Sequence, residues 1–308
     1  MKRLALILVP LGLLACVLAY TMHASSKAVY KVTDLGTLNG YRSEAIDINN
    51  AGQVVGNITI KRGDKSYEHA FLWEKGVMKD LGTMGYEESI AVGINNKGQV
   101  VGTLQEKANR FWKDSRGFIW QNGKMVELAL FDGFHTIPTS IDDQGGIIGY
   151  LIDDKVKASR FIWEDGKFRH LESAYDRHSP DRGNYFAPNK SIRLPNGKIV
   201  TLGSFRGDDG YTQPRDMNGH GVIIGISDTS ELLPPIGWPD EDRFTQYVTK
   251  PFVWADGKMH DLNSLLPAFS RRRMGLPNGI NDEGQIVGKS KGKYGHALLL
   301  TPIRPLPR

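Results

Sequence analysis

Cysteine is nearly absent from this chain. Cys16 is the only one among 308 residues, so no disulfide can form within the chain. Packing and hydrogen bonds must therefore stabilise everything that follows it. An excess of one charge is also missing, with 39 Lys and Arg against 34 Asp and Glu. The only basic run, Arg271 to Arg273, is too short for a nucleic-acid footprint, and we expect no nucleic-acid partner.

Catalytic signatures are missing as well. The chain contains no HExxH, no GxSxG, no P-loop and no dinucleotide fingerprint. The densest acidic spots, 208–209 and 240–242, read as solvated loop tips, although one sequence does not show which carboxylates face each other. We assign no catalytic residue, and the sequence favours a binding protein over an enzyme.

Metal and cofactor signals are weak. The turns IDDQGG (141–146) and INDEGQ (280–285) slightly resemble calcium loops, but they lack the full ligand spacing and the distal Glu. His170 and His260 align with Asp80 in an earlier copy of the repeat described below, which suggests a metal ring or, more simply, polar tips on a rim. The sequence predicts no metal and no cofactor.

Residues 1–24 read as a targeting segment. Lys2 and Arg3 precede an apolar run from Leu4 to Tyr20. Three fates stay open: cleavage after Ala19, lipidation of Cys16 at the lipobox-like LLAC, or retention as a membrane anchor. Each exports the rest of the chain, which would be secreted, periplasmic or membrane-anchored. Membrane contact is expected only through this segment.

One pattern recurs with a period near 46 residues between 30 and 302. INNAGQVVG (48–56) returns as INNKGQVVG (94–102), IDDQGGIIG (141–149), MNGHGVIIG (217–225) and INDEGQIVG (280–288). HAFLWEKGVMKDLGT (69–83) returns at 116–130, 159–173, 191–204 and 250–264. A fixed period of this length indicates one supersecondary unit copied around an array.

Each unit reads as a four-stranded antiparallel meander, with strands a to d. In the first copy these are 43–48, 53–58, 69–74 and 77–81. An Asn-initiated type I turn with a positive-φ Gly joins a to b, and Asn-Gly or Asp-Gly pairs join most c and d strands. Both faces of strand c are apolar, so both must be covered by neighbouring units, as in the blades of a propeller.

Six c strands and six d strands can be counted, while the sixth a–b hairpin is degenerate at 179–187. The chain starts on a d-type strand (30–35) and ends on a c-type strand (296–300). We therefore predict an all-β, six-bladed β-propeller over 30–302, closed by the N-terminal strand, and a monomer.

The tripeptide His69-Ala70-Phe71, the flanking DLGT (34–37 and 80–83) and INNxGQVVG resemble the HAF repeat family of bacterial extracellular proteins. The resemblance implies export and a β-propeller-like fold. It supplies no catalytic residues. His at the named position is kept only at His69 and His296, which argues against a histidine-based reaction in every blade.

The long insertions should all lie on one face, formed by the b–c loops and the d–a connections. They are 59–68, 103–115 and 226–249. Their aromatic and basic residues make the predicted ligand site: Trp238, Arg243, Tyr247, Arg110 and Trp112. The predicted function is a non-enzymatic binding module for a glycan, peptide or protein at the cell envelope. The alternative is a polysaccharide hydrolase or lyase with its site in the central channel.

Overall fold

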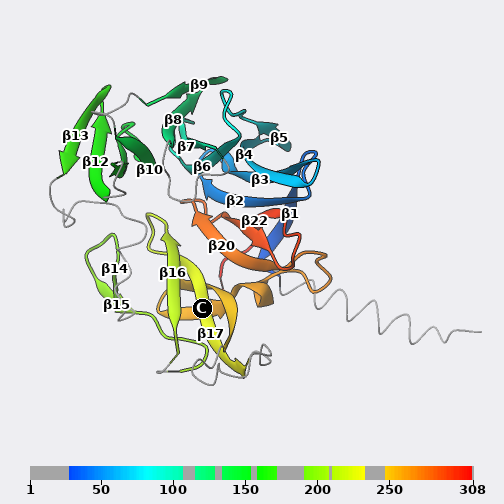
Figure 1. The fold of residues 1–308 in the computed structure, drawn as a ribbon. Helices are drawn as coiled ribbons and strands as arrows, with labels where there is room; N and C mark the ends of the chain where they lie inside the picture. The colour runs from blue at the N-terminus through cyan, green and yellow to red at the C-terminus, as the bar shows by residue number, and fades with distance from the viewer. Residues whose placement is uncertain are drawn as a thin grey trace, which may run out of the picture.

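The computed structural model describes residues 28–106, 115–128, 134–153, 158–171, 191–207, 210–232 and 247–306. These residues form an all-β structure of antiparallel sheets with one short 3₁₀ helix, η1 (Leu262–Leu265). The sheets follow one another around the molecule in chain order (Figure 1). In the part of the chain described, no helix is long and apolar enough to cross a bilayer.

The first repeat unit forms the predicted meander, and we call it the first sheet. It consists of β2 (Arg42–Ile48), β3 (Val54–Arg62), β4 (Lys65–Glu74) and β5 (Val77–Asp80), paired in that order. The expectation of a loop over 59–68 was wrong. β3 and β4 extend as a continuous ladder until Arg62 faces Lys65, because Thr59, Ile60 and Tyr67 supply strand-forming side chains up to the turn.

The same order recurs in the second, third and fifth sheets. Their strands are β6 (Glu88–Ile94), β7 (Val100–Gln105), β8 (Arg116–Gln121) and β9 (Lys124–Glu127); β10 (His135–Ile141), β11 (Ile147–Ile152), β12 (Ala158–Glu164) and β13 (Lys167–Leu171); and β16 (Thr212–Met217), β17 (Ile223–Leu232), β18 (Tyr247–Ala255) and β19 (Lys258–Asp261). The fourth sheet has two described strands, β14 (Ser191–Arg193) and β15 (Ile199–Thr201). The degenerate hairpin at 179–187 lies outside the described residues.

The two ends of the described chain meet in the sixth sheet. β20 (Met274–Ile280), β21 (Ile286–Ser290) and β22 (Ala297–Pro302) pair in sequence, and β1 (Tyr30–Gly36) adds the fourth strand. Tyr30 lies opposite Pro302 and Asp34 opposite Leu298 in an antiparallel register. This is the pairing of first and last strands that the repeat pattern predicted.

Strand c is covered on both faces by different neighbours, as its sequence indicated. Phe71 packs in one cluster with Val287 and Leu299 of the sixth sheet. Ala70 and Leu72, which alternate with it, pack with Phe118 of the second sheet. The first, second, fifth and sixth sheets are thus each a layer between two others, and the core is divided among these interfaces.

The first strands of successive sheets lie side by side. β16 contacts β20, β20 contacts β2, β2 contacts β6 and β6 contacts β10. Each of these strands carries a β-bulge at the same place, such as Ala45/Asp47 in β2 and Ala91/Gly93 in β6. Five first strands therefore surround a common axis, with the fourth sheet on the side between β10 and β16 (Figure 1). The architecture is propeller-like.

Candidate functional site

The a–b and c–d hairpins gather on one face, which we call the turn face. Asn49, Asn95 and Asn281 show why Asn begins the a–b turns. Each side chain accepts a hydrogen bond from its own turn, for example from Gln99 N to Asn95 Oδ1 at 3.0 Å. Each also donates from Nδ2 to the backbone carbonyl of the next turn, with distances of 2.9 to 3.0 Å. The turns are therefore linked from sheet to sheet.

A second, more exposed set of bonds runs alongside the first. Asn50 N donates to Asn96 Oδ1 at 2.8 Å, and Asn96 Nδ2 donates to Asp143 Oδ2 at 2.8 Å. Asp282 accepts from Asn50 Nδ2 at 2.8 Å and from Gly219 N at 2.7 Å. The bond from Asn50, the bond from Gly219 and the charge of His220 lower the pKa of Asp282, although partial burial opposes them. Both carboxylate oxygens of Asp282 therefore already accept hydrogen bonds from neighbouring turns.

Asp142 interrupts the ladder of turns. It occupies the position of Asn49 and Asn95, and its Oδ1 accepts from three N–H groups of its own turn, at 2.7 to 2.9 Å. A carboxylate has no N–H to donate to a following turn. The linked series therefore runs from Asn218 through Asn281, Asn49 and Asn95 and ends at residue 142.

The opposite face, the loop face, contains the b–c loops and the d–a connections. Four of the five predicted ligand residues, Trp238, Arg243, Arg110 and Trp112, lie outside the described residues, as does Cys16. Tyr247 begins β18, where its backbone pairs with Leu232 at the end of β17. The described structure therefore places one of the five, at the first described residue after 233–246.

A tyrosine pair that the sequence analysis missed lies on the described part of the loop face. Tyr41 and Tyr294 meet edge to face, with ring centroids 5.9 Å apart, across the junction of the first and sixth sheets. Tyr294 is 55% exposed, whereas the Tyr41 hydroxyl donates to Ser66 Oγ at 3.1 Å. Ser43 N donates to Gly295 O at 3.0 Å and ties the two loops together. The rings come from loops 253 positions apart, so no local pattern could have paired them.

Cations flank this tyrosine pair. Lys61 Nζ lies 5.3 Å from the centroid of the Tyr41 ring, and Lys293 Nζ lies 5.5 Å from that of Tyr294. Lys65 and Lys291 are exposed nearby in the chain. The arrangement offers an aromatic ring and ammonium groups on one surface, which we call the tyrosine–lysine patch. It suits a ligand that stacks on a ring and accepts hydrogen bonds.

The histidines of the HAF motif make structural pairs. His69 Nδ1 lies 2.8 Å from Asp80 Oδ2, and His296 Nδ1 lies 2.9 Å from Asp34 Oδ1. In the fifth sheet Lys250 replaces the histidine and lies 3.5 Å from Asp261. The motif thus joins strand c to strand d by a polar pair.

The register corrects one detail of the sequence alignment. Asp80 lies opposite Phe71, and the residue opposite the equivalent Phe252 is Asp261, with His260 one position earlier. His170, opposite Phe161, does match Asp80. Among the described residues no group of three or more His, Cys, Asp or Glu side chains is placed to hold a metal ion.

The carboxylates of the first strands serve the scaffold. Asp47 is buried and accepts from Ile94 N in the next sheet at 2.9 Å, and Asp216 accepts from Ile280 N at the same distance. Glu44 accepts from Asn278 Nδ2 at 3.0 Å and lies 3.5 Å from Lys289 Nζ. Each of these three groups links two sheets or neutralises a cation, which is a positioning role.

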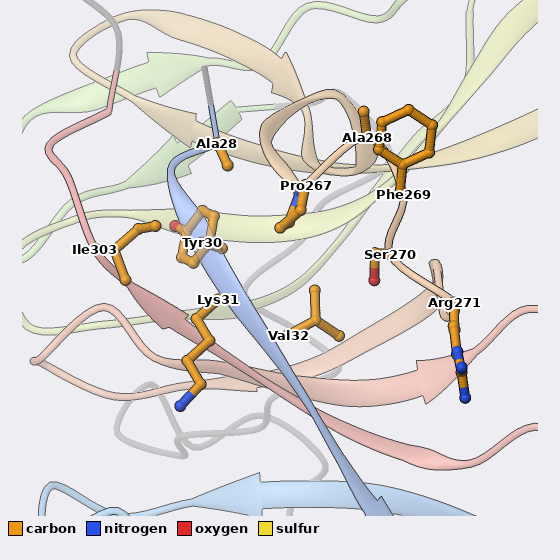
Figure 2. Close-up of a pocket in the computed structure, with 10 residues that line it drawn as sticks. All are labelled: Ala28, Tyr30, Lys31, Val32, Pro267, Ala268, Phe269, Ser270, Arg271 and Ile303. Atoms are coloured by element: carbon orange, nitrogen blue, oxygen red, sulfur yellow. The ribbon is translucent and has the colours of Figure 1, made fainter. Parts of the chain in front are cut away.

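A pocket of about 720 Å³ lies on the outer edge, where β1 faces the segment after η1 (Figure 2). Tyr30 and Val32 form one wall, Pro267 and Phe269 another, and Ile303 closes the end. Lys31 and Arg271 stand at its rim. No signal in the repeat marks this place, because the repeated pattern at 250–264 ends before the pocket residues 267–271.

Comparisons with known proteins give structural neighbours alone. No family model and no curated protein sequence matches the chain. The structure resembles that of a provisionally assigned gluconolactonase, with 12% identity, 91% of this chain and 94% of that chain covered, and a TM-score of 0.43. It also resembles the β-propeller domain of the Trilobed protease from Pyrococcus furiosus, with 10% identity, 86% of each chain covered and a TM-score of 0.31.

A third neighbour is an acylaminoacyl peptidase from Pyrococcus horikoshii. The identity is 13%, the TM-score is 0.30, and the match covers 79% of this chain but 35% of the peptidase. The chain thus spans about a third of that enzyme's length. With TM-scores below 0.5, none of these neighbours assigns a substrate or a reaction to the chain.

Proposed function

We propose that this chain is an exported, non-enzymatic β-propeller that binds a glycan, peptide or protein partner at the cell envelope through its loop face. The observation that carries the proposal is the tyrosine–lysine patch. An exposed ring beside two ammonium groups is typical of recognition surfaces. The turn face offers less, because its amide and carboxylate groups bond to one another.

The proposal includes a ring of six blades closed through β1. Five neighbouring first strands around an axis and the pairing of β1 with β22 support it. The fourth blade would be formed by β14, β15 and the hairpin at 179–187. Such closure leaves no long free edge and fixes the loops of distant units on one surface.

Export and family membership belong to the same proposal. The basic and apolar composition of residues 1–24 supports export, by cleavage, lipidation at Cys16 or anchoring. The HAF motif supports a relationship with the HAF repeat family, and the pairing of its histidine with the aspartate of DLGT gives the motif a physical reason.

A glycan array tests the loop face. The full chain should bind a defined set of glycans, and Tyr294→Ala should weaken that binding about tenfold, because stacking on the ring is lost. Tyr211→Ala is the matched control, since Tyr211 is 56% exposed on the same face but has no partner ring among the described residues. Binding unchanged by Tyr294→Ala would remove the patch from the site.

The predicted loop residues form a second arm of the experiment. Trp238→Ala and Trp112→Ala should each reduce binding if the insertions share the ligand with the patch. Loss in these two variants with none in Tyr294→Ala would move the site to the insertions. No glycan, peptide or envelope-protein binding by the intact chain would contradict the proposed function itself.

A further inference from the structure

The pocket of Figure 2 is built by three segments that brace one another. Val29 N donates to Leu265 O at 2.8 Å, and Ile303 N donates to Val29 O at 2.8 Å. Arg273 Nη2 donates to Ala268 O at 2.7 Å and Nη1 to Asn263 O at 2.9 Å, which supports the segment 267–271 from behind. The walls are therefore formed before any ligand arrives.

The lining is apolar but stays open to solvent. Tyr30 is 2% exposed and forms the wall with Val32, whereas Phe269 and Ile303 at the rim are 67% and 54% exposed. A volume of about 720 Å³ lies within the usual range for small-molecule sites. Large apolar side chains exposed around a concave surface indicate an apolar ligand.

Two cations at the rim have no partner in the described part of the chain. Arg271 begins a run of three arginines, and the other two already have hydrogen-bond partners. Arg272 bonds to Asp34 at 3.1 Å and Arg273 to backbone carbonyls. Arg271 and Lys31 are exposed and make no hydrogen bond or salt bridge within the described ranges. Both are available to an anionic group outside the apolar walls.

The Tyr30 hydroxyl is a third polar group at the pocket. It makes no hydrogen bond with any described residue, although the side chain is almost fully buried. Burial raises the pKa of the Tyr30 phenol well above its ordinary value, so the hydroxyl keeps its proton near neutral pH. It can therefore donate a hydrogen bond to a ligand oxygen.

From this arrangement we infer that the edge pocket binds a single-chain anionic amphiphile of the long-chain carboxylate type. The alkyl chain lies against Tyr30, Val32 and Phe269, and the carboxylate leaves the apolar walls toward one of the two rim cations, Lys31 or Arg271, which stand on opposite sides of the pocket (Figure 2). This inference does not rest on the tyrosine–lysine patch, because none of Tyr41, Tyr294, Lys61 and Lys293 lines the pocket.

Titration of the full chain with 11-(dansylamino)undecanoate tests the inference. Saturable binding with a blue-shifted emission is expected. Val32→Trp fills the pocket and should weaken binding about tenfold or more. Lys31→Glu with Arg271→Glu should weaken it about five- to tenfold, yet leave binding of the neutral dansylaminoundecanol unchanged.

The matched controls are Val126→Trp and Lys124→Glu on β9, which is the outermost strand of its own sheet as β1 is of the sixth. Both should bind like the unchanged chain. Equal affinity in Val32→Trp, or no saturable binding by the unchanged chain, would overturn the inference. Binding to anionic phospholipid vesicles that Val32→Trp retains, without binding of the monomeric probe, would assign a membrane surface instead and overturn it too.

Discussion

At the scale of single residues, the second glycine of each GQVVG motif has a specific packing role. Gly102 in β7 lies beneath the Phe118 ring, and a Cβ added there would come within 2.6 Å of the ring and closer still to the Ile90 carbonyl. Gly56, Gly149 and Gly225 meet the equivalent phenylalanines. The sequence shows that this glycine recurs, but the reason depends on the bulged first strand beside it.

Gly102→Ala should therefore lower the free energy of unfolding by about 3 kcal/mol, because neither the backbone carbonyl nor the packed ring can move aside. Urea denaturation of the intact chain measures this. Gly203→Ala is the control, since a Cβ at Gly203 would meet no atom within 4 Å. Equal losses in the two variants would contradict the packing explanation.

Asp34, also a single residue, should make the stability of the fold depend on pH. Burial alone would raise the pKa of Asp34, but bonds from Gly36 N and His296, together with the charges of His296 and Arg272, lower it overall. His296 Nδ1 lies 2.9 Å from Asp34 Oδ1, and Arg272 Nε lies 3.1 Å from Asp34 Oδ2. A carboxylate whose pKa is lower in the folded state than in the unfolded state stabilises the fold at pH values above its unfolded-state pKa. This stabilisation is lost as the pH falls through its folded-state pKa.

Asp34→Asn should thus reduce stability at pH 7 by at most about 1 kcal/mol, since the group is partly exposed. The difference from the unchanged chain should shrink as the pH falls below about 4, where the carboxylate takes up its proton. Urea midpoints at both pH values check this. Asp165→Asn, in a turn where Asn fits equally well, should show no such pH dependence.

At the scale of elements, the repeat alone predicts the strands and turns closely. The predicted a strand at 43–48 is β2, and the a–b turn has the expected bond from Gly52 N to Asn49 O at 3.0 Å. The positive φ of Asn122 and Gly123 matches the hairpin signal between c and d. Local chemistry fixes these features, which is why one sequence suffices for them.

Contacts between units were not predictable in the same way. The donation from each turn asparagine to the next turn depends on how neighbouring sheets are rotated, and a linear pattern does not encode that angle. The HAF pair is an intermediate case. The residues of each pair stand eleven positions apart at His69 and Asp80 and again at Lys250 and Asp261, so a search of facing positions could have found it.

Asn95 tests the turn ladder. Asn95→Ala removes both the acceptor for Gln99 N and the donor to Asp142 O, and should cost about 2 to 3 kcal/mol because the site is 3% exposed. Asn95→Asp keeps the acceptor and loses the donor, so its loss should be smaller but clear. If Asn95→Asp were as stable as the unchanged chain, the bond between the turns would contribute nothing.

At the scale of the whole molecule, the radial order of the sheets follows from the two apolar faces of strand c. The sequence indicated that each unit must be covered on both sides, and Phe71 and Leu72 do pack against opposite neighbours. The edge pocket could not be predicted, because it combines the start of β1 with a connection more than 230 positions later. Residues 267–271 lie outside the repeated pattern and therefore carry no repeat signal.

The joining of the two chain ends gives the last prediction. Lys31 in β1 lies opposite Thr301 in β22, a spacing that suits a disulfide. In a Cys16→Ser background, Lys31→Cys with Thr301→Cys should form a disulfide under mild oxidation and raise the free energy of unfolding by about 3 to 5 kcal/mol, since the bond closes nearly the entire chain into one loop. A faster band on a non-reducing gel and a higher urea midpoint, both reversed by reductant, are the expected results. The single variants should show neither.

If the two cysteines stay reduced, or if the bond forms and leaves the midpoint unchanged, β1 does not hold the ring together. The six-bladed closure would then lose its main support, because a closed ring requires its first strand to stay paired with its last throughout the folded state.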